Sequence, residues 1–176
     1  MLNIKCIVNG YLNENCYIVE KDNHALIIDP GSDGIKIIDY IENLNLQVDG
    51  ILITHYHFDH VGALQSIENK YKDTIKIDYN SPNNNEIGCF KFKKINNFGH
   101  TMDSCSFLFY DENIMFTGDF VFNESIGKYD FENEKEMISS LKRFVRLNDD
   151  IVIYPGHGPS STVGHEKKYN YFLRGI

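Results

Sequence analysis

Three histidines and one aspartate share a stretch of six residues: His55, His57, Asp59 and His60. They follow the apolar run 50–53, which is typical of a short buried strand, so the polar side chains are expected where that strand ends. Neutral imidazole and carboxylate are preferred ligands of zinc and other borderline divalent metals. Histidines in a core would each need buried hydrogen-bond partners. A metal site therefore explains this cluster better than core packing or a histidine-rich solvated turn.

Three more ligand-type residues occur downstream, and each follows a glycine: His100, Asp119 and His157. Glycine allows the backbone to turn tightly and to approach a site closely. A purely structural zinc site closes at four ligands, whereas this chain offers seven. The surplus favours a catalytic metal centre over a non-catalytic metal-binding scaffold.

In this order, the His-x-His-x-Asp-His motif, the later histidine, Gly-Asp and Gly-His resemble the metallo-β-lactamase superfamily. The resemblance runs from Asp29-Pro30-Gly31 to the tail 160–168, which is similar to the ends of short glyoxalase-II-like members. It implies an α/β fold: a four-layer αββα sandwich of two mixed β-sheets, with helices outside and a dinuclear site at one edge. These motifs are specific for the superfamily and say little about the substrate.

The resemblance also implies how two metal ions would be held. The ligands of the first ion would be His55, His57 and His100, and those of the second Asp59, His60 and His157. Asp119 would bridge the two ions, and both Asp59 and Asp119 would take part in catalysis. Zn²⁺ is the favoured metal, with iron or manganese as alternatives. A hydroxide that bridges the ions would be the nucleophile, since a metal lowers the pKa of bound water to about 7.

Two further residues have expected roles that the motif does not include. Asp29 would brace the histidine loop, because a metal-bound histidine usually donates its other ring N–H to such a group; its alternative role is a turn or helix cap. Lys128 lies in a segment that resembles the Gly-basic stretch of glyoxalase-II-like proteins, where a basic residue faces the glutathione part of a thioester. Its alternative role is an exposed loop lysine. His24 and His165 are expected at the surface.

The resulting functional prediction is an enzyme that hydrolyses a small thioester or ester, most similar to a short glyoxalase II acting on S-lactoylglutathione. A lactonase uses the same metal chemistry and stays open. So does a persulfide dioxygenase, which would hold one iron through His55, His100 and Asp119. The C-terminal helical domain of full-length glyoxalase II is not expected within 176 residues, which leaves glutathione recognition open.

Short apolar segments with polar turns between them supply the elements that must position these residues. Strands are expected at 2–8, 15–20 and 24–29 as an antiparallel meander, then at 50–53, 75–77, 105–110, 113–117 and 150–154. Helices are expected at 34–45, with Ile35, Ile38, Ile41 (or Ile37) and Leu44 on one face, at 61–71, and at 134–147. Asn133 and Glu136 match a capping box. Residues 81–85 and 120–131 are expected to be loops, and 88–95 alternate imperfectly.

Length and composition restrict the remaining classes. A chain of 176 residues predicts a single domain, 1–176. The formal charge of −8 argues against a nucleic-acid surface, which should be basic. No apolar run approaches the roughly 18 residues of a membrane span, and no signal peptide is expected. Four cysteines without a Cys-x-x-Cys pair fit a reduced, cytoplasmic protein. We therefore expect a small-molecule substrate, while the oligomeric state stays open.

Overall fold

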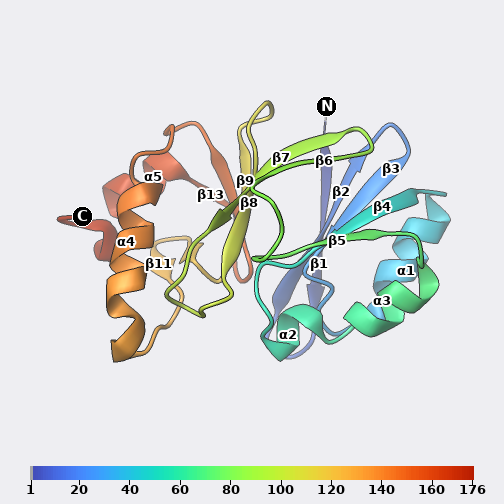
Figure 1. The fold of residues 1–176 in the computed structure, drawn as a ribbon, viewed down its shortest axis with the longest axis horizontal. Coiled ribbons are helices and arrows are strands. Elements are labelled where there is room, and N and C mark those ends of the chain that lie inside the picture. Colours follow the sequence, from blue (N-terminus) through green and yellow to red (C-terminus); the bar gives the residue numbers. More distant parts are fainter. Residues whose placement is uncertain (1) are drawn as a thin grey trace.

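The computed structural model describes residues 2–176 and has two β-sheets at its centre (Figure 1). The first sheet has the order β1 (Asn3–Asn9), β2 (Glu14–Lys21), β3 (His24–Ile28), β4 (Gln47–Leu52), β5 (Ile75–Ile77). The first three strands pair antiparallel, as the meander pattern predicted. β3, β4 and β5 then pair parallel. The sheet is therefore mixed.

The second sheet is also mixed. Its order is β13 (Ser161–Thr162), β12 (Val152–Pro155), β9 (Ile114–Gly118), β8 (Cys105–Phe109), β7 (Phe90–Asn96), β6 (Asn84–Ile87). β9 and β12 pair parallel, and every other neighbouring pair is antiparallel. A separate small hairpin joins β10 (Val121–Phe122) to β11 (Ser125–Ile126).

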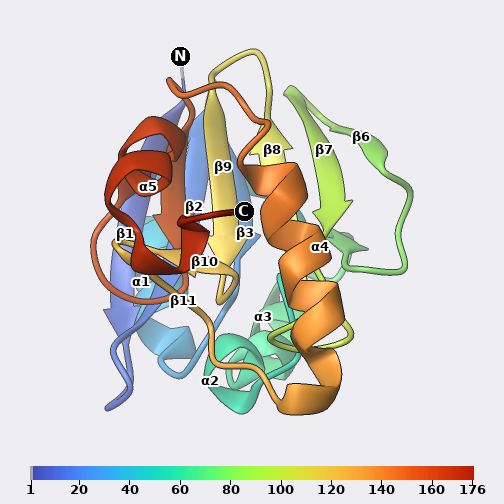
Figure 2. The ribbon, with the colours of Figure 1, turned by 90° about the vertical axis from the view of Figure 1, so that its left-hand side faces the viewer.

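Helices cover the outer faces of both sheets (Figures 1 and 2). α1 (Gly34–Asn43) and α3 (Leu64–Lys70) lie on the first sheet, and α4 (Glu134–Phe144) and α5 (Val163–Tyr169) lie on the second. The short α2 (Phe58–Val61) lies at one edge, and 3₁₀ turns span Phe131–Asn133 and Tyr171–Leu173. The predicted αββα sandwich is thereby confirmed. Between Leu2 and Ile176, none of the helices has the length and apolar character that crossing a membrane requires.

Three apolar clusters hold the four layers together. The central one lies between the sheets and is rich in buried phenylalanines: Phe90, Phe92, Phe107, Phe109 and Phe116. A second packs α4 and α5 on the second sheet, and a third packs α1 and α3 on the first. Burial of apolar surface is the dominant stabilising contribution to such a fold.

The topology brings several strand ends to one edge of the sandwich. β3 and β4 are parallel in one sheet, and β9 and β12 are parallel in the other. The carboxyl ends of parallel strands meet at the same edge, where ligands bind in open α/β sheets. β7 is antiparallel to β8, which is antiparallel to β9, so the end of β7 lies at that edge too. The segments that follow these strands carry all seven candidate ligands.

One local prediction for a helix was correct only in part, and another was wrong. In α1, Ile41 and the alternative Ile37 are buried and Ile38 packs against their cluster, as predicted, while Ile35 and Leu44 are exposed. The isoleucines allow two overlapping apolar faces, and only packing against the sheet selects one of them. The capping box does not form, because Asn133 has helix-like backbone angles at the end of a 3₁₀ turn and its side chain makes no capping hydrogen bond.

The predicted helix at 61–71 corresponds to α3, which begins three residues later, at Leu64, while Val61 ends the separate short helix α2. The amide of Ala63 donates to the carbonyl of Pro30 at 3.0 Å instead of continuing a helix. The hairpins β6–β7 and β10–β11 replace expected loops or irregular segments. In β6 the residues Asn84, Asn85 and Glu86 have a low strand propensity, which pairing with β7 overrides.

Truncation of a phenylalanine side chain in the central apolar cluster should lower the free energy of unfolding measurably. Phe92 is fully buried and contacts Phe107 and Phe109, with ring centroids 5.9 and 5.1 Å away. Phe92→Ala should lower the free energy of unfolding by about 3–5 kcal/mol, because it removes buried apolar surface and leaves a cavity. Urea unfolding of the metal-free protein measures this change. Phe131→Ala, at an 89% exposed position, is the control and should cost less than about 0.5 kcal/mol.

Candidate metal centre

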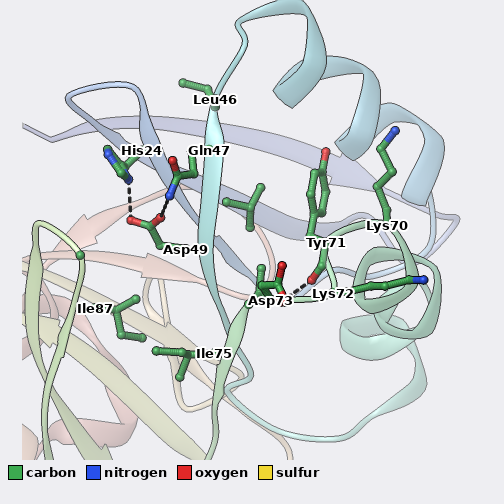
Figure 3. A pocket seen from close by; sticks show the side chains of 13 residues that line it. His24, Leu46, Gln47, Asp49, Lys70, Tyr71, Lys72, Asp73, Ile75 and Ile87 are labelled. Atoms are coloured by element: carbon green, nitrogen blue, oxygen red, sulfur yellow. Dashed lines mark hydrogen bonds and ion pairs between the residues drawn. The ribbon is translucent and has the colours of Figure 1, made fainter.

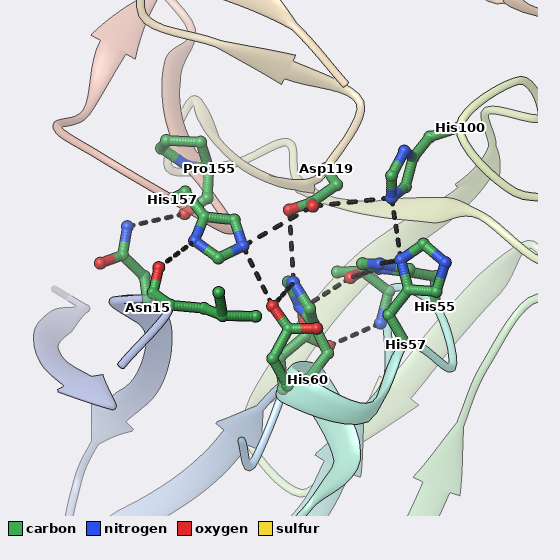
Figure 4. Close-up of polar contacts among 12 residues, drawn as sticks. Asn15, His55, His57, His60, His100, Asp119, Pro155 and His157 are labelled. Atoms are coloured by element: carbon green, nitrogen blue, oxygen red, sulfur yellow. Dashed lines mark hydrogen bonds and ion pairs between the residues drawn. The ribbon is translucent and has the colours of Figure 1, made fainter. Parts of the chain in front are cut away.

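The seven candidate ligands converge at the edge where the strands end (Figure 4). β4 leads into the motif with His55 and His57, and α2 carries Asp59 and His60. The loop between β7 and β8 carries His100, and the ends of β9 and β12 present Asp119 and His157. Three groups of ligand atoms each lie within 4.8 Å of one another: His55, His57, His100; His55, His60, Asp119; and Asp59, His60, His157.

The first trio has its ring nitrogens close together. Nδ1 of His57 lies 3.0 Å from Nε2 of His55 and 3.0 Å from Nε2 of His100. Ligand atoms that bind one tetrahedral zinc ion at about 2.0–2.1 Å lie about 3.4 Å apart. The separations in this trio are close to that value. Three ring nitrogens at these separations therefore fit a shared cation.

The second trio combines one carboxylate with two imidazoles. Oδ2 of Asp59 lies 3.3 Å from Nε2 of His157 and 3.8 Å from Nε2 of His60. The rings of His60 and His157 meet edge to face, with centroids 5.5 Å apart. This donor set of nitrogen and oxygen atoms suits zinc, iron or manganese.

Asp119 lies between the two trios (Figure 4). Its Oδ2 is 3.6 Å from Nε2 of His100 and 3.7 Å from Nε2 of His157, and its Oδ1 is 3.3 Å from Nε2 of His60. Oδ1 of Asp119 and Nε2 of His60 lack hydrogen-bond geometry, and both atoms are buried without a hydrogen-bond partner. Buried polar atoms are rarely left unpaired. Their orphaned state fits metal ions shared between the trios.

The carboxylate of Asp29 holds the motif from behind. Its Oδ1 accepts from the amide of Thr54 at 2.7 Å, and its Oδ2 accepts from the Thr54 hydroxyl at 2.6 Å. The same Oδ2 lies 2.9 Å from Nδ1 of His60, which leaves Nε2 of that ring directed toward Asp119. A histidine that binds metal through one nitrogen is commonly oriented in this way through the other.

Backbone carbonyls orient two other histidines. Nδ1 of His157 lies 3.1 Å from the carbonyl oxygen of Leu12, and Nδ1 of His100 lies 2.5 Å from that of Lys128. Each contact leaves Nε2 facing the cluster. The Lys128 side chain is exposed, so its predicted contact with substrate stays a prediction. Carbonyls carry no residue-specific signal, and the sequence could not have indicated either contact.

Asn15 and Tyr17 were not predicted to take part, yet they fix the turn that presents His157. The amide group of Asn15 donates to the carbonyls of Pro155 and Gly158 at 3.0 and 2.8 Å. The Tyr17 hydroxyl donates to the carbonyl of Pro155 at 2.6 Å. A polar residue inside the apolar strand β2 is the one sequence signal that could have identified Asn15.

Burial and neighbouring charges set the protonation of the metal-free cluster. Burial, with His60 nearby, lowers the pKa of His55 to about 2. Burial alone would raise the pKa of Asp119, but the interaction with His60 outweighs it and holds that pKa at about 2. Burial also disfavours the charged form of His60, yet Asp119 and Asp29 raise its pKa well above the usual value. Both carboxylates therefore favour the charged form of His60 in the metal-free cluster.

Glu14 is a further buried carboxyl group close to the site. It is fully buried, and its backbone bridges that of His157. Burial, followed by the charge of Asp29, raises the pKa of Glu14 to about 9, so the group is neutral at pH 7. It adds no negative charge to the metal-free cluster.

A surface cavity of about 620 Å³ lies elsewhere, beside the start of β4 (Figure 3). His24 lines it, with Nδ1 2.8 Å from Oδ2 of Asp49, and the Gln47 side chain donates to the same carboxylate at 3.1 Å. His24 is partly exposed, as predicted for a surface residue, and so is His165, which lies 3.0 Å from Glu124. These paired groups match none of the three ligand clusters.

Comparisons with known proteins agree with this geometry. Residues 9–85 and 82–157 match the family model described as "Metallo-beta-lactamase superfamily". Hydroxyacylglutathione hydrolase GloC from Haemophilus influenzae is 31% identical and matches over 98% of this chain and 98% of its own length. The crystal structure of BLEG-1 B3 metallo-beta-lactamase gives a TM-score of 0.92 at 26% identity, covering 98% of this chain and 100% of that chain. TTHA1623 in a di-iron-bound form gives a TM-score of 0.87 at 27% identity, covering 96% and 100%.

A methyl group at Gly156 should disturb the cluster. A Cβ there would lie 2.3 Å from Oδ1 of Asp119 and 2.6 Å from Cε1 of His60. Gly156→Ala should weaken metal binding by about tenfold or more, because a candidate ligand must move. Competition with a chelator measures this. Gly158→Ala in the same turn is the control: its Cβ would meet no atom within 4 Å, although its φ of +77° adds backbone strain. Equal losses in both variants would attribute the effect to strain and contradict the steric explanation.

Metal binding through Nε2 of His60 should release protons. We expect a measurable release when Zn²⁺ binds the metal-free protein at pH 7, because the ion displaces protons from its ligands. Because the pKa of His60 is raised, protons compete with the ion below that pKa, and affinity should fall as the pH decreases. Calorimetric titrations in buffers of different ionisation enthalpy measure the release. His60→Gln should release fewer protons, and buffer-independent heats in the unsubstituted protein would contradict the assignment.

Proposed function

The chain belongs to the metallo-β-lactamase superfamily, and we propose that it hydrolyses small thioesters or esters with two divalent metal ions. The observation that carries this proposal is the position of Asp119 between two complete ligand trios. A site for one ion would not need a second trio on the far side of that carboxylate. The relatives include a hydroxyacylglutathione hydrolase, which supports a hydrolase in particular.

The donor atoms determine which ions would suit the site. They come from imidazoles and carboxylates, with no cysteine sulfur, which favours zinc and keeps iron and manganese as alternatives. TTHA1623 has been crystallised in a di-iron-bound form. When bound, the ions would supply Lewis acidity and a water molecule with a pKa of about 7. His55, His57 and His100 would hold one ion, and Asp59, His60 and His157 the other, with Asp119 shared.

The residues around the ligands preorganise this centre. Asp29 fixes the ring of His60, and carbonyl oxygens fix the rings of His100 and His157. Imidazoles held in this way need little rearrangement when a charged species binds. Such preorganisation of polar groups is usually the largest contribution to electrostatic stabilisation in enzymes. The Oδ2 of Asp59 lies within 4 Å of ring nitrogens of both His157 and His60, and Asp59 would accept a proton from the attacking water.

The proposed substrate is a small thioester such as S-lactoylglutathione, with lactones and other esters as alternatives. Lys128 would face its anionic part, since its exposed side chain belongs to the segment whose carbonyl contacts His100. The acidic charge of −8 argues against a nucleic-acid partner. A cytoplasmic location stays a prediction from the cysteine usage.

Metal content and substrate turnover together test the proposal. The protein would be expressed with zinc, iron and manganese supplied together, analysed by mass spectrometry, and assayed on S-lactoylglutathione and a lactone panel. About two ions per chain with hydrolysis would support the proposal. One iron with oxygen uptake on glutathione persulfide would indicate the persulfide dioxygenase instead. Absence of metal above background would refute the ligand assignment.

Substitution of the shared carboxylate gives a specific prediction. Asp119→Asn should lower kcat/KM for thioester hydrolysis by about 100- to 1,000-fold, because a neutral amide cannot balance the charge of two ions. Asp49→Asn is the matched control: that carboxylate also pairs with a histidine, at 2.8 Å from His24, but lies beside the distant cavity. Persistent thioesterase activity in Asp119→Asn, with circular dichroism unchanged, would contradict the metal-centred mechanism.

A further inference from the structure

The segments that converge on the candidate metal centre also present large apolar side chains to solvent. We define the rim as residues 10–13, 54–60, 99–104, 119–133 and 156–160. Tyr11 is 89% exposed, Phe58 66%, Met102 53% and Phe131 89%. Each belongs to a different rim segment, and the segment of Phe131 also holds Lys128. Exposed apolar side chains therefore occur on four of the five segments that carry the ligands or contact them.

The turn between β1 and β2 is part of this rim. The carbonyl of Leu12 contacts Nδ1 of His157, so the turn lies directly beside a candidate ligand. Gly10 and Asn13 have positive φ angles of 58° and 54°, which fix a tight tip between them. Turn tips normally carry polar residues, whereas this one carries Tyr11 and Leu12, which is 46% exposed. Figure 2 shows the turn and α2 at the same end of the molecule.

The charges of the rim residues restrict the number of anionic groups that a substrate can carry. Lys128 is the single lysine or arginine in the rim segments. Four acidic residues outside the candidate ligand set accompany it: Asp103, Glu124, Asp130 and Glu132. A substrate with several anionic groups would need several cations, because a desolvated unpaired charge is costly. Glutathione carries two carboxylates beside its ammonium group, and phosphate-bearing thiols carry more negative charge.

We propose that the rim selects thioesters or esters whose acyl group is an apolar chain and whose leaving group carries at most one anionic group. This inference rests on the proposed hydrolase function and names the substrate class for the same site. Tyr11 adjoins Leu12, whose carbonyl contacts His157, and Met102 is two residues from His100, so an acyl chain lying on these side chains would have its carbonyl near the ligands. A chain that covers the rim side chains also removes them from water, which is favourable in proportion to the buried area.

The first experiment measures chain-length dependence with a fixed leaving group. Acetyl, butyryl, hexanoyl and octanoyl thioesters of N-acetylcysteamine would be assayed with the metal-loaded protein, together with S-lactoylglutathione. Complete burial of one methylene raises affinity by about fourfold, and half burial by about twofold. We expect kcat/KM to rise by about tenfold from acetyl to hexanoyl and to exceed that for S-lactoylglutathione. A flat or falling series, with efficient S-lactoylglutathione hydrolysis, would overturn the inference and leave the proposed function intact.

Matched variants test whether the rim is responsible. Tyr11→Ser and Met102→Ser should each reduce the ratio of hexanoyl to acetyl kcat/KM by about threefold, with metal content unchanged. Tyr110→Ser is the control, since this exposed tyrosine lies at the β8–β9 turn at the opposite end of the molecule (Figure 2). If both rim variants retain the selectivity and instead change the sedimentation velocity, the apolar rim is an interface between copies of the chain, and the inference is wrong.

Binding without turnover separates this inference from the hydrolase proposal. S-alkyl thioether analogues of the same series cannot be hydrolysed, and calorimetry gives their Kd. We expect Kd to fall by about tenfold from ethyl to hexyl and this gain to shrink in Tyr11→Ser. If no ester or thioester is hydrolysed but this trend holds, the proposed function fails while the rim remains an apolar binding surface. Equal Kd values throughout the series would overturn the inference.

Discussion

The carboxylate of Asp29 joins the ends of two parallel strands, and the geometry of the candidate metal centre depends on it. Asp29 ends β3, and the Thr54 amide and hydroxyl that it binds follow β4. Its remaining contact fixes the ring of His60. The residue has a positive φ of 49°, a strained conformation for a non-glycine residue. Three buried hydrogen-bonding contacts to one carboxylate offset that strain, and their loss would leave buried donors unpaired.

Thr54 extends this link to the second sheet. Its carbonyl accepts from the amide of Cys105 in β8 at 2.8 Å. Gly118 at the end of β9 packs so closely that a Cβ would lie 2.4 Å from the Thr54 hydroxyl. The glycine, with φ of +53°, thereby lets the two sheets meet where Asp119 begins. One threonine thus touches the ends of strands from both sheets, which explains how ligands from distant segments reach a common centre.

The metal centre and its rim contribute different parts of the proposed function. Ligands at strand ends are held by the central core and by hydrogen bonds, so the arrangement is rigid and suited to hydrolytic metal chemistry. The rim segments are turns and loops together with the short α2 and the β10–β11 hairpin, and the central core constrains them less. Exposed Tyr11 and Met102, with Lys128 as the nearby cation, are the features of this chain that would distinguish substrates. Fold and metal site alone are shared by proteins of differing activity.

The sequence by itself determined which side chains can act as ligands, because the type and spacing of the histidines and aspartates are local properties, and the resemblance of these motifs to a known superfamily implied the αββα fold class. The tertiary structure decided how these side chains are held. Tyr17 contacts the carbonyl of Pro155 across 138 positions of sequence, and carbonyls of Leu12 and Lys128 orient two histidines. Packing also selected the buried face of α1. Backbone carbonyls are identical in every residue, so only the folded arrangement of distant segments could assign these contacts.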